Sequence, residues 1–356
     1  MIRGFDMHVC IISGYKTSAG GLENFVSELS NFLIKHNVRV TIFNIFHKDL
    51  EEIGQHYWMK MIRPYNILPP RFRFALYEDY AYSLKVWRKI RFSNYFDIIH
   101  GNSGFCFFQA LFRDRTPFIM TFHGLRKGFH YKVYGPNSRI LKCPRYYTLF
   151  YSEEFAAKKC DLAIAPSKSV RDELLSIYKV NPAKVKVIYN GVNTDHFRPI
   201  NRNFSREFLG LPKNKNYVIW VGNNPRLKGL QIATKAVKGL KNVYLLVVGV
   251  SGTNFENVIF WGEVQNRELL LILYNAANVL VFPTLYEGFP LVPLEAMACG
   301  LPIIISEECP TKEIIRNGVE GFIVKREPNF FKEKIKTLLE NDKLYREILQ
   351  FKFVLY

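Results

Sequence analysis

Two glutamates, Glu287 and Glu295, lie eight residues apart around the start of a predicted helix. Glu287 stands in the loop before Pro290, a residue suited to the first helical turn, and Glu295 follows one to two turns later. A carboxylate can accept two hydrogen bonds from a vicinal diol, so this spacing suits one extended ligand with hydroxyls at both ends, such as a ribose and a hexose. The alternative is a helix with one capping and one surface glutamate. The apolar neighbours of Glu295 disfavour it, because an unpaired charge among them would be costly.

A second candidate site is the loop of residues 222–229, which follows a predicted strand and leads into a predicted helix. The free N–H groups at a helix start attract anions, and Gly222 lets the backbone approach a ligand closely. Lys228 adds one positive charge and Arg226 adds a second. These features favour a diphosphate as the ligand. The alternative is an ordinary turn whose charges face water, and this loop taken alone favours that simpler interpretation.

Two weaker signals lie in the first half of the chain. Gly20 and Gly21 open a predicted helix, although a glycine pair more often marks a tight turn. His100 and His123 each end a predicted strand, where a lone histidine is more often structural than catalytic. His123 is the better candidate of the two, because a glycine and a long polar and aromatic loop follow it.

Several motifs are absent from the sequence. There is no Gly-x-Gly-x-x-Gly, no phosphate-binding Gly-x-x-x-x-Gly-Lys-Ser/Thr and no His-Glu-x-x-His. No Asp-x-Asp offers a carboxylate pair for a metal-bound diphosphate. The six cysteines form no Cys-x-x-Cys pair and are best explained as reduced core residues. We therefore predict no bound metal and no resident cofactor.

The elements that must position these loops alternate between strands and helices. Strands are expected at residues 7–13, 38–43, 97–100, 117–123, 161–165 and 185–189, and again at 217–222, 242–250, 258–261, 278–283 and 302–306. Helices are expected at residues 21–35, 167–178, 228–239, 268–276, 290–299 and 329–340. Such alternation predicts parallel sheets covered on both faces. The polar segment 201–216 is interpreted as a linker or domain edge, which gives two doubly wound α/β domains, 1–200 and 201–356.

The positive charge is concentrated in the first half. The chain has a formal net charge of +18, and residues 1–200 carry 29 Lys and Arg against 16 Asp and Glu. This balance suggests an acidic partner, which could be nucleic acid, an anionic membrane surface or a phosphate-bearing substrate. No nucleic-acid-binding motif is present, so a specific nucleic acid is not expected.

Segments 71–92 and 126–151 mix basic with aromatic residues. One interpretation is a face that docks on an anionic membrane, where lipid-linked acceptors lie. The alternative is a set of helices with aromatic core contacts and a solvated basic side. All apolar runs fall short of the ~20 residues that a membrane span needs. We therefore expect a cytoplasmic protein, peripheral on the inner face of the membrane if it docks there.

Taken together, the loops resemble those of glycosyltransferase family 4, the retaining GT-B enzymes also called glycosyl transferases group 1. The resemblance covers residues 7 to about 340. It rests on Gly20-Gly21-Leu22-Glu23, His123-Gly124, Ala165-Pro166-Ser167, Asn190-Gly191-Val192, Lys228-Gly229 and the Glu-x7-Glu pattern from Glu287 to Glu295. It implies an α/β GT-B fold in which two Rossmann-like domains face each other across a cleft, the first on the acceptor side and the second binding the nucleotide sugar.

The resemblance also implies a role for each matching residue. Lys228 would bind the donor diphosphate, Glu287 the hydroxyls of the donor sugar and Glu295 those of the ribose. His123 would lie beside the donor sugar, so that the catalytic residues are Glu287, His123 and Lys228. The other donor-binding positions would be Gly20, Gly21, Asn223, Arg226, Gly262, Val264, Gly288, Phe289, Pro290 and Leu291.

The implied reaction moves a sugar from a UDP- or GDP-linked donor to an acceptor hydroxyl on a glycan or lipid-linked glycan, with retention of configuration and without a metal. Asn223 departs from the family, which usually has arginine there, and Arg226 would supply that charge instead. Three alternatives remain: an inactive relative of these enzymes, a sugar-nucleotide epimerase and, with less support, a basic nucleic-acid-binding protein.

Overall fold

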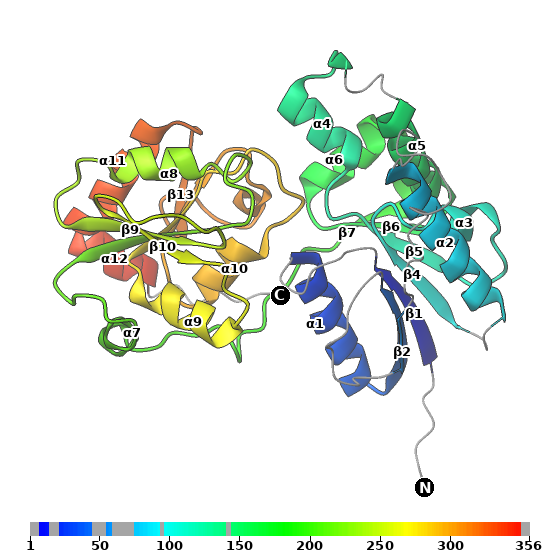
Figure 1. Ribbon diagram of the computed structural model, residues 1–356, viewed down its shortest axis with the longest axis horizontal. Coiled ribbons are helices and arrows are strands. Elements are labelled where there is room, and N and C mark those ends of the chain that lie inside the picture. The colour runs from blue at the N-terminus through cyan, green and yellow to red at the C-terminus, as the bar shows by residue number, and fades with distance from the viewer. Residues whose placement is uncertain are drawn as a thin grey trace, which may run out of the picture. The chain divides into compact units, whose positions relative to one another are not determined.

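The computed structural model describes residues 7–13, 21–44, 55–58, 75–92, 96–139 and 144–349. The chain forms two compact units, Met1–Tyr189 and Asn190–Tyr356 (Figure 1). The sequence places the boundary later, after residue 200. Residues 190–200 pack within the second unit, because Phe197 is fully buried in that unit's core and the backbone N–H of Ile200 donates to Asn275 Oδ1 at 2.7 Å.

Within the described residues, the first unit contains a seven-stranded parallel sheet in the order β3-β2-β1-β4-β5-β6-β7. The strands are β1 (Met7–Ser13), β2 (Val38–Asn44), β3 (Gln55–Trp58), β4 (Ile98–Asn102), β5 (Phe118–Thr121), β6 (Leu162–Ala165) and β7 (Val185–Val187). The α-helices are α1 (Gly21–Lys35), α2 (Ala75–Phe92), α3 (Phe107–Leu111), α4 (Arg126–Tyr134), α5 (Pro144–Lys159) and α6 (Lys168–Ser176).

Strand β1 shows why this sheet has two cores. Val9 and Ile11 pack in a cluster with Val26 of α1, whereas Cys10 and Ile12 pack in a second cluster with residues of α2, α3, α5 and α6. Successive strand side chains point to opposite faces, so a continuous apolar strand must be covered on both sides. The predicted layered arrangement is therefore confirmed in this unit.

Within the described residues, the second unit contains a six-stranded parallel sheet in the order β10-β9-β8-β11-β12-β13. The strands are β8 (Asn216–Val221), β9 (Val243–Val248), β10 (Val258–Gly262), β11 (Val279–Phe282), β12 (Ile303–Ser306) and β13 (Gly321–Val324). The α-helices are α7 (Arg202–Phe208), α8 (Leu230–Val237), α9 (Arg267–Ala276), α10 (Leu291–Ala298), α11 (Pro328–Glu340) and α12 (Asp342–Leu349).

The strand order of each sheet reverses at one place, between β1 and β4 in the first unit and between β8 and β11 in the second. Ligands of open parallel sheets bind beyond the carboxyl ends of the strands at such a switch point. The loops after β8 and β11 are therefore the first place to look for a site in the second unit.

Two local predictions were wrong. The segment 201–216 is not an irregular linker, because Asn201 Oδ1 accepts hydrogen bonds from the N–H groups of Asn203 and Phe204 and so caps helix α7. The helix predicted from residue 228 begins only at Leu230, since Gly229 adopts a left-handed conformation with φ of +68°. Lys228 thus belongs to the loop rather than to the helix.

Two broader expectations concern membrane-spanning helices and cysteines among the described residues. None of their helices is both long enough and apolar enough to cross a membrane. The five cysteines among them, Cys10, Cys106, Cys160, Cys299 and Cys309, are buried and free, and Cys143 lies outside the described residues.

Candidate active site

Lys228 and Glu287 meet at the switch point of the second unit. Lys228 lies in the loop after β8 and Glu287 in the loop after its neighbour β11. The ammonium nitrogen is 3.4 Å from Glu287 Oε1, and each side chain is 18% exposed. Glu287 Oε1 is otherwise buried, with no hydrogen-bond partner among the described residues. This half-buried pair can offer a cation to a phosphate and a carboxylate to hydroxyls.

The loop after β8 holds Lys228 in a defined place. Asn224 Oδ1 accepts a hydrogen bond from the N–H of Leu227 at 3.0 Å, and the indole N–H of Trp220 donates to the carbonyl of Lys228 at 2.9 Å. The lysine stem lies against Gly222, where an added Cβ would stand 2.5 Å from Lys228 Cδ. Any side chain at position 222 would therefore displace the lysine.

The loops that carry Lys228 and Glu287 are joined directly to each other. The N–H of Leu285 donates to the carbonyl of Leu227 at 2.9 Å. Beside this bond, an added Cβ at Gly229 would lie 2.3 Å from the carbonyl oxygen of Pro283. Both this close approach and the positive φ of Gly229 require glycine.

Helix α10 follows Glu287 and places Glu295 about one turn inside. The helix begins at Leu291, one residue later than the sequence predicts, and residues 288–290 before it are buried. The carbonyl of Phe289 accepts a hydrogen bond from Asn190 Nδ2 at 2.8 Å. Asn190 belongs to a stretch that the sequence analysis matched to the family without giving it a role, and the structure shows that its amide fixes the backbone of this loop.

Glu295 is only 5% exposed, which excludes a surface glutamate. The hydroxyl of Tyr274 in α9 donates to Glu295 Oε2 at 2.9 Å. Burial, and then the charge of Glu295, raise the pKa of Tyr274 well above its ordinary value. A hydroxyl partner of this kind makes a carboxylate tolerable in an apolar setting. No sequence pattern marks Tyr274 as that partner.

Glycine backbones bring the loops after β8, β9 and β10 together. An added Cβ at Gly249 would lie 2.6 Å from the carbonyl oxygen of Gly222, and the N–H of Gly249 donates to the carbonyl of Gly262 at 2.7 Å. Val264 follows and packs, half-buried, against the apolar core. The predicted positions 262 and 264 therefore share an edge with the Lys228 loop, and Gly249 is a contact that the sequence analysis missed.

The remaining predicted donor-binding residues are more exposed or less constrained. Asn223 and Arg226 are exposed, and the carbonyl of Arg226 accepts a hydrogen bond from Arg326 Nη2 at 3.3 Å. Gly21 is the first residue of α1 in the first unit and has open space around its Cα. Gly20 lies outside the described residues.

His123 follows β5 in the first unit, with its Nε2 3.0 Å from Asn102 Oδ1. Asn102 Nδ2 donates to the carbonyl of Ile12 at 3.4 Å, which turns the amide oxygen toward the imidazole. Nε2 of His123 then carries the proton and Nδ1 is the acceptor atom. Burial, and then His100, lower the pKa of His123 to about 3, so the ring is neutral at pH 7. His100 is itself buried in β4, 2.8 Å from Thr121 Oγ1.

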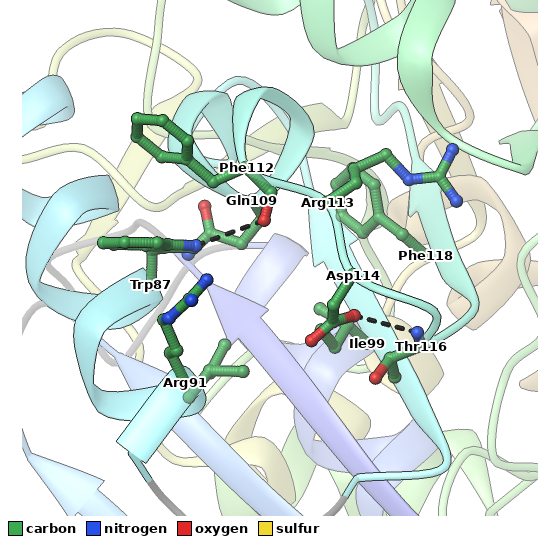
Figure 2. A pocket seen from close by; sticks show the side chains of 10 residues that line it. Trp87, Arg91, Ile99, Gln109, Phe112, Arg113, Asp114, Thr116 and Phe118 are labelled. Atoms are coloured by element: carbon green, nitrogen blue, oxygen red, sulfur yellow. Dashed lines mark hydrogen bonds between the residues drawn. The ribbon is translucent and has the colours of Figure 1, made fainter.

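A pocket in the first unit lies near the amino ends of the strands, whereas His123 follows the carboxyl end of β5 (Figure 2). Ile99 and Phe118, near the amino ends of β4 and β5, line it, together with residues of α2 and of the segment before β5. Asp114 Oδ1 accepts a hydrogen bond from the N–H of Thr116 at 2.8 Å, whereas Arg113 pairs at 2.6 Å with Asp161, which does not line the pocket. None of the predicted site residues lines this pocket, so we do not assign the donor to it.

Across the part of the chain that the structure describes, no three His, Cys, Asp or Glu side chains gather as a metal site.

Comparison with known families matches almost the whole chain. The family described as Glycosyltransferase Family 4 matches residues 19–196, and the family described as Glycosyl transferases group 1 matches residues 201–351. These two matches meet close to the division between the two units.

Similar curated proteins carry glycosyltransferase names. The D-inositol 3-phosphate glycosyltransferase of Mycolicibacterium paratuberculosis is 30% identical over 249 residues, which cover 65% of this chain and 55% of that protein. An uncharacterized glycosyltransferase of Methanocaldococcus jannaschii is 30% identical over 231 residues, which cover 59% of this chain and 56% of that protein. The chain thus spans little more than half the length of these relatives.

Solved structures share the fold over almost the full chain. Sucrose-phosphate synthase from Thermosynechococcus elongatus superposes with a TM-score of 0.81 at 22% identity, covering 97% of this chain and 92% of that one. HepE of Anabaena, solved with UDP and glucose, has a TM-score of 0.76 at 18% identity, covering 97% and 93%. WaaG, a glycosyltransferase involved in lipopolysaccharide biosynthesis, has a TM-score of 0.77 at 16% identity, covering 96% and 93%. The predicted two-domain α/β GT-B fold is confirmed.

Proposed function

The chain belongs to glycosyltransferase family 4, and from this premise we propose that it transfers a sugar from a nucleoside-diphosphate sugar to an acceptor hydroxyl with retention of configuration. The observation that carries the proposal is the 3.4 Å pair of Lys228 and Glu287 at the switch point of the second unit. One such donor carries the two groups that this pair can bind, a diphosphate and a sugar.

Donor binding exchanges the partners of this pair. The diphosphate binds the ammonium of Lys228. The sugar hydroxyls donate hydrogen bonds to Glu287, whose Oε1 has no hydrogen bond among the described residues. The backbone of residues 288–291, held through Asn190, faces the sugar and phosphates. Glu295 accepts hydrogen bonds from the ribose hydroxyls, while the hydroxyl of Tyr274 keeps its hydrogen bond to Oε2 of Glu295.

In the reaction, the bond between the anomeric carbon and the diphosphate oxygen breaks, and the acceptor oxygen bonds to that carbon from the same face. The acceptor proton passes to the departing phosphate oxygen. Lys228, with Arg226 and nearby helix N-termini, stabilises the charge that develops on the diphosphate. The role of His123 beside the donor sugar stays a prediction; its imidazole, neutral at pH 7, would serve there as a hydrogen-bonding group and not as a cation.

The donor is tested first by thermal shift, with UDP, GDP and ADP and their common sugar conjugates. Structures of HepE with UDP, with UDP-glucose and with UDP and glucose make uridine nucleotides the first choice. A ligand at 100 times its Kd should stabilise the protein by about 2.7 kcal/mol. We expect one nucleotide to raise the melting temperature, and a smaller rise in Lys228→Ala. No shift with any nucleotide would overturn the proposal and favour an inactive relative.

We propose that no metal takes part, because cationic side chains and helix N-termini supply the charge that the diphosphate needs. The shift with the preferred nucleotide should be the same in EDTA and in magnesium. A shift that appears only with magnesium would contradict this part of the proposal.

For the acceptor, we propose a glycan or lipid-linked glycan that the enzyme reaches at an anionic membrane surface. Helices α2, α3 and α5 lie together, since the indole of Trp87 donates to the carbonyl of Phe112 at 3.3 Å and the rings of Phe107 and Phe155 are 5.2 Å apart (Figure 1). They and the residues next to them present exposed apolar side chains. These are Phe92, Leu111, Phe112, Tyr147 and Tyr151.

The same helices present exposed basic residues, which are Arg88, Lys89, Arg91, Lys158 and Lys159. The exposed apolar and basic side chains of α2, α3 and α5 together form what we call the aromatic-basic face. Exposed aromatic and basic side chains on neighbouring helices suit the boundary between anionic headgroups and acyl chains. Not every aromatic residue serves it, because Tyr82 is fully buried and bonds to the carbonyls of Ser13 and Phe43. Residues 71–74, which the sequence analysis included, lie outside the described residues.

A further inference from the structure

Arg326, a residue that the sequence analysis did not select, reaches both loops of the candidate site. We propose that Arg326 is a positioning residue: it sets the distance between Lys228 and Glu287 so that one donor can place its diphosphate on the first and its sugar on the second. This inference rests on the proposed function, and it identifies the residue that holds Lys228 and Glu287 at the spacing that the donor needs.

The contacts of Arg326 place it between the two loops. Its Nε donates to the carbonyl of Pro283 at 2.9 Å, and its Nη2 donates to the carbonyl of Arg226 at 3.3 Å. Pro283 begins the loop that carries Glu287, and Arg226 lies two residues before Lys228. One guanidinium therefore bridges the two segments whose ends form the ion pair.

The sheet topology explains why a residue so far along the chain can do this. Arg326 follows β13, and β12 separates β13 from β11. Its side chain must pass the end of β12 to reach the loops after β11 and β8. A long side chain with several N–H donors in a rigid fork suits such a span, whereas lysine offers only a point charge.

The charge of the guanidinium is supported from the loop after β12. Burial lowers the pKa of Arg326, and the negative charge of Glu308 opposes that effect. Glu308 Oε2 is buried and has no hydrogen-bond partner among the described residues. Carbonyl acceptors and a nearby carboxylate are the surroundings in which a half-buried arginine stays charged and donates strongly.

Apart from the Lys228–Glu287 pair itself, two backbone contacts also join these loops. They are the bond from the N–H of Leu285 to the carbonyl of Leu227 at 2.9 Å and the close contact of Gly229 with Pro283. Without Arg326, the carbonyls of Pro283 and Arg226 lose a charged donor, and the loops gain freedom to separate. The phosphate and the sugar of one donor would then no longer fit both side chains at once.

The test compares Arg326→Met and Arg326→Lys with the matched control Lys325→Met. Lys325 is the exposed neighbour whose ammonium lies 5.8 Å from the centre of the Phe330 ring. For each protein, the Kd values of UDP and UDP-glucose are measured by calorimetry, with GDP and GDP-mannose as a second pair. The ratio of the two Kd values reports what the sugar adds to binding.

We expect Arg326→Met to bind the nucleotide within about twofold of wild type but to lose about tenfold in the contribution of the sugar, which corresponds to about 1.4 kcal/mol. Arg326→Lys should be intermediate and Lys325→Met unchanged. An unchanged ratio in Arg326→Met, or an equal loss for nucleotide and nucleotide sugar, would overturn the positioning role. If wild type binds none of the probes, the proposed function itself fails.

A second measurement does not depend on the donor. Amide hydrogen exchange in Arg326→Met should rise at residues 222–229 and 283–290, whereas α9 should keep the protection of wild type. Equal exchange in these loops, or a rise spread over the whole second unit, would show that Arg326 does not hold them specifically.

Discussion

The ammonium nitrogen of Lys228 lies 3.4 Å from Oε1 of Glu287, although the two residues come from loops after different strands. Each side chain is 18% exposed, so the pair is mostly shielded from water but not fully buried. Each charge neutralises the other, and a donor has to offer a substitute to both.

Replacing one member of the pair should cost more stability than replacing both. Lys228→Met leaves the Glu287 carboxylate half-buried without its cation, which should lower the free energy of unfolding by about 1–3 kcal/mol. The double variant Lys228→Met with Glu287→Gln should recover part of this loss, while turnover stays at least about 100-fold below wild type. Urea unfolding and donor turnover measure the two effects. Additive stability changes would show that the pair does not interact.

Gly229→Ala should both destabilise the second unit and weaken donor binding, since its Cβ would lie 2.3 Å from the carbonyl oxygen of Pro283. The matched control is Gly239→Ala, which shares the positive φ but meets only Lys332 Nζ, at 3.8 Å. The left-handed conformation costs both variants about 1–2 kcal/mol. Only Gly229→Ala should lose more than this and raise the Kd of the nucleotide sugar. Equal losses in melting temperature and equal Kd values would contradict the role of this contact.

Stability should fall in mild acid because buried His100 and half-buried His123 are neutral in the folded protein. Burial, and then His100, lower the pKa of His123 to about 3, and burial lowers that of His100 to about 4, from 6.5 in both cases. At pH values between the lowered pKa of each histidine and 6.5, the unfolded chain binds more protons than the folded one. The free energy of unfolding therefore decreases as pH drops from about 6.5 toward 4. Urea titrations at several pH values measure the slope, and His123→Gln should reduce it. The same slope in that variant would contradict the assignment.

Membrane binding should depend on the aromatic-basic face. Phe92 is 84% exposed and Tyr147 is 64% exposed. Burying one such side chain is worth about 1.5–3 kcal/mol, so Phe92→Ser with Tyr147→Ser should weaken binding to phosphatidylglycerol vesicles by about tenfold or more. Phe208→Ser is the control, because Phe208 is 65% exposed in the second unit. Co-sedimentation that is equal for phosphatidylglycerol and phosphatidylcholine vesicles, or unaffected by the variants, would remove the membrane from the proposal.

Features that depend on local periodicity were predictable from the amino-acid order. The predicted bounds of β1, Met7–Ser13, and of α1, Gly21–Lys35, agree with the structure. The layered α/β architecture follows, because long apolar strands between amphipathic helices can be buried only in a doubly covered sheet. Lys228 and Glu287 were predictable as candidates for the same reason, since both stand in loops that follow strands.

Contacts between residues far apart in the chain could be known only from the folded structure. Helix α7 was missed because its helix signal lies in one capping side chain, that of Asn201, within an otherwise polar segment. Tyr274 and Arg326 have no sequence signature for their roles, because their partners Glu295 and Pro283 are brought to them by packing and strand order. Spacing in the sequence indicates which groups belong to a site, whereas the distances between those groups are set when the sheet assembles.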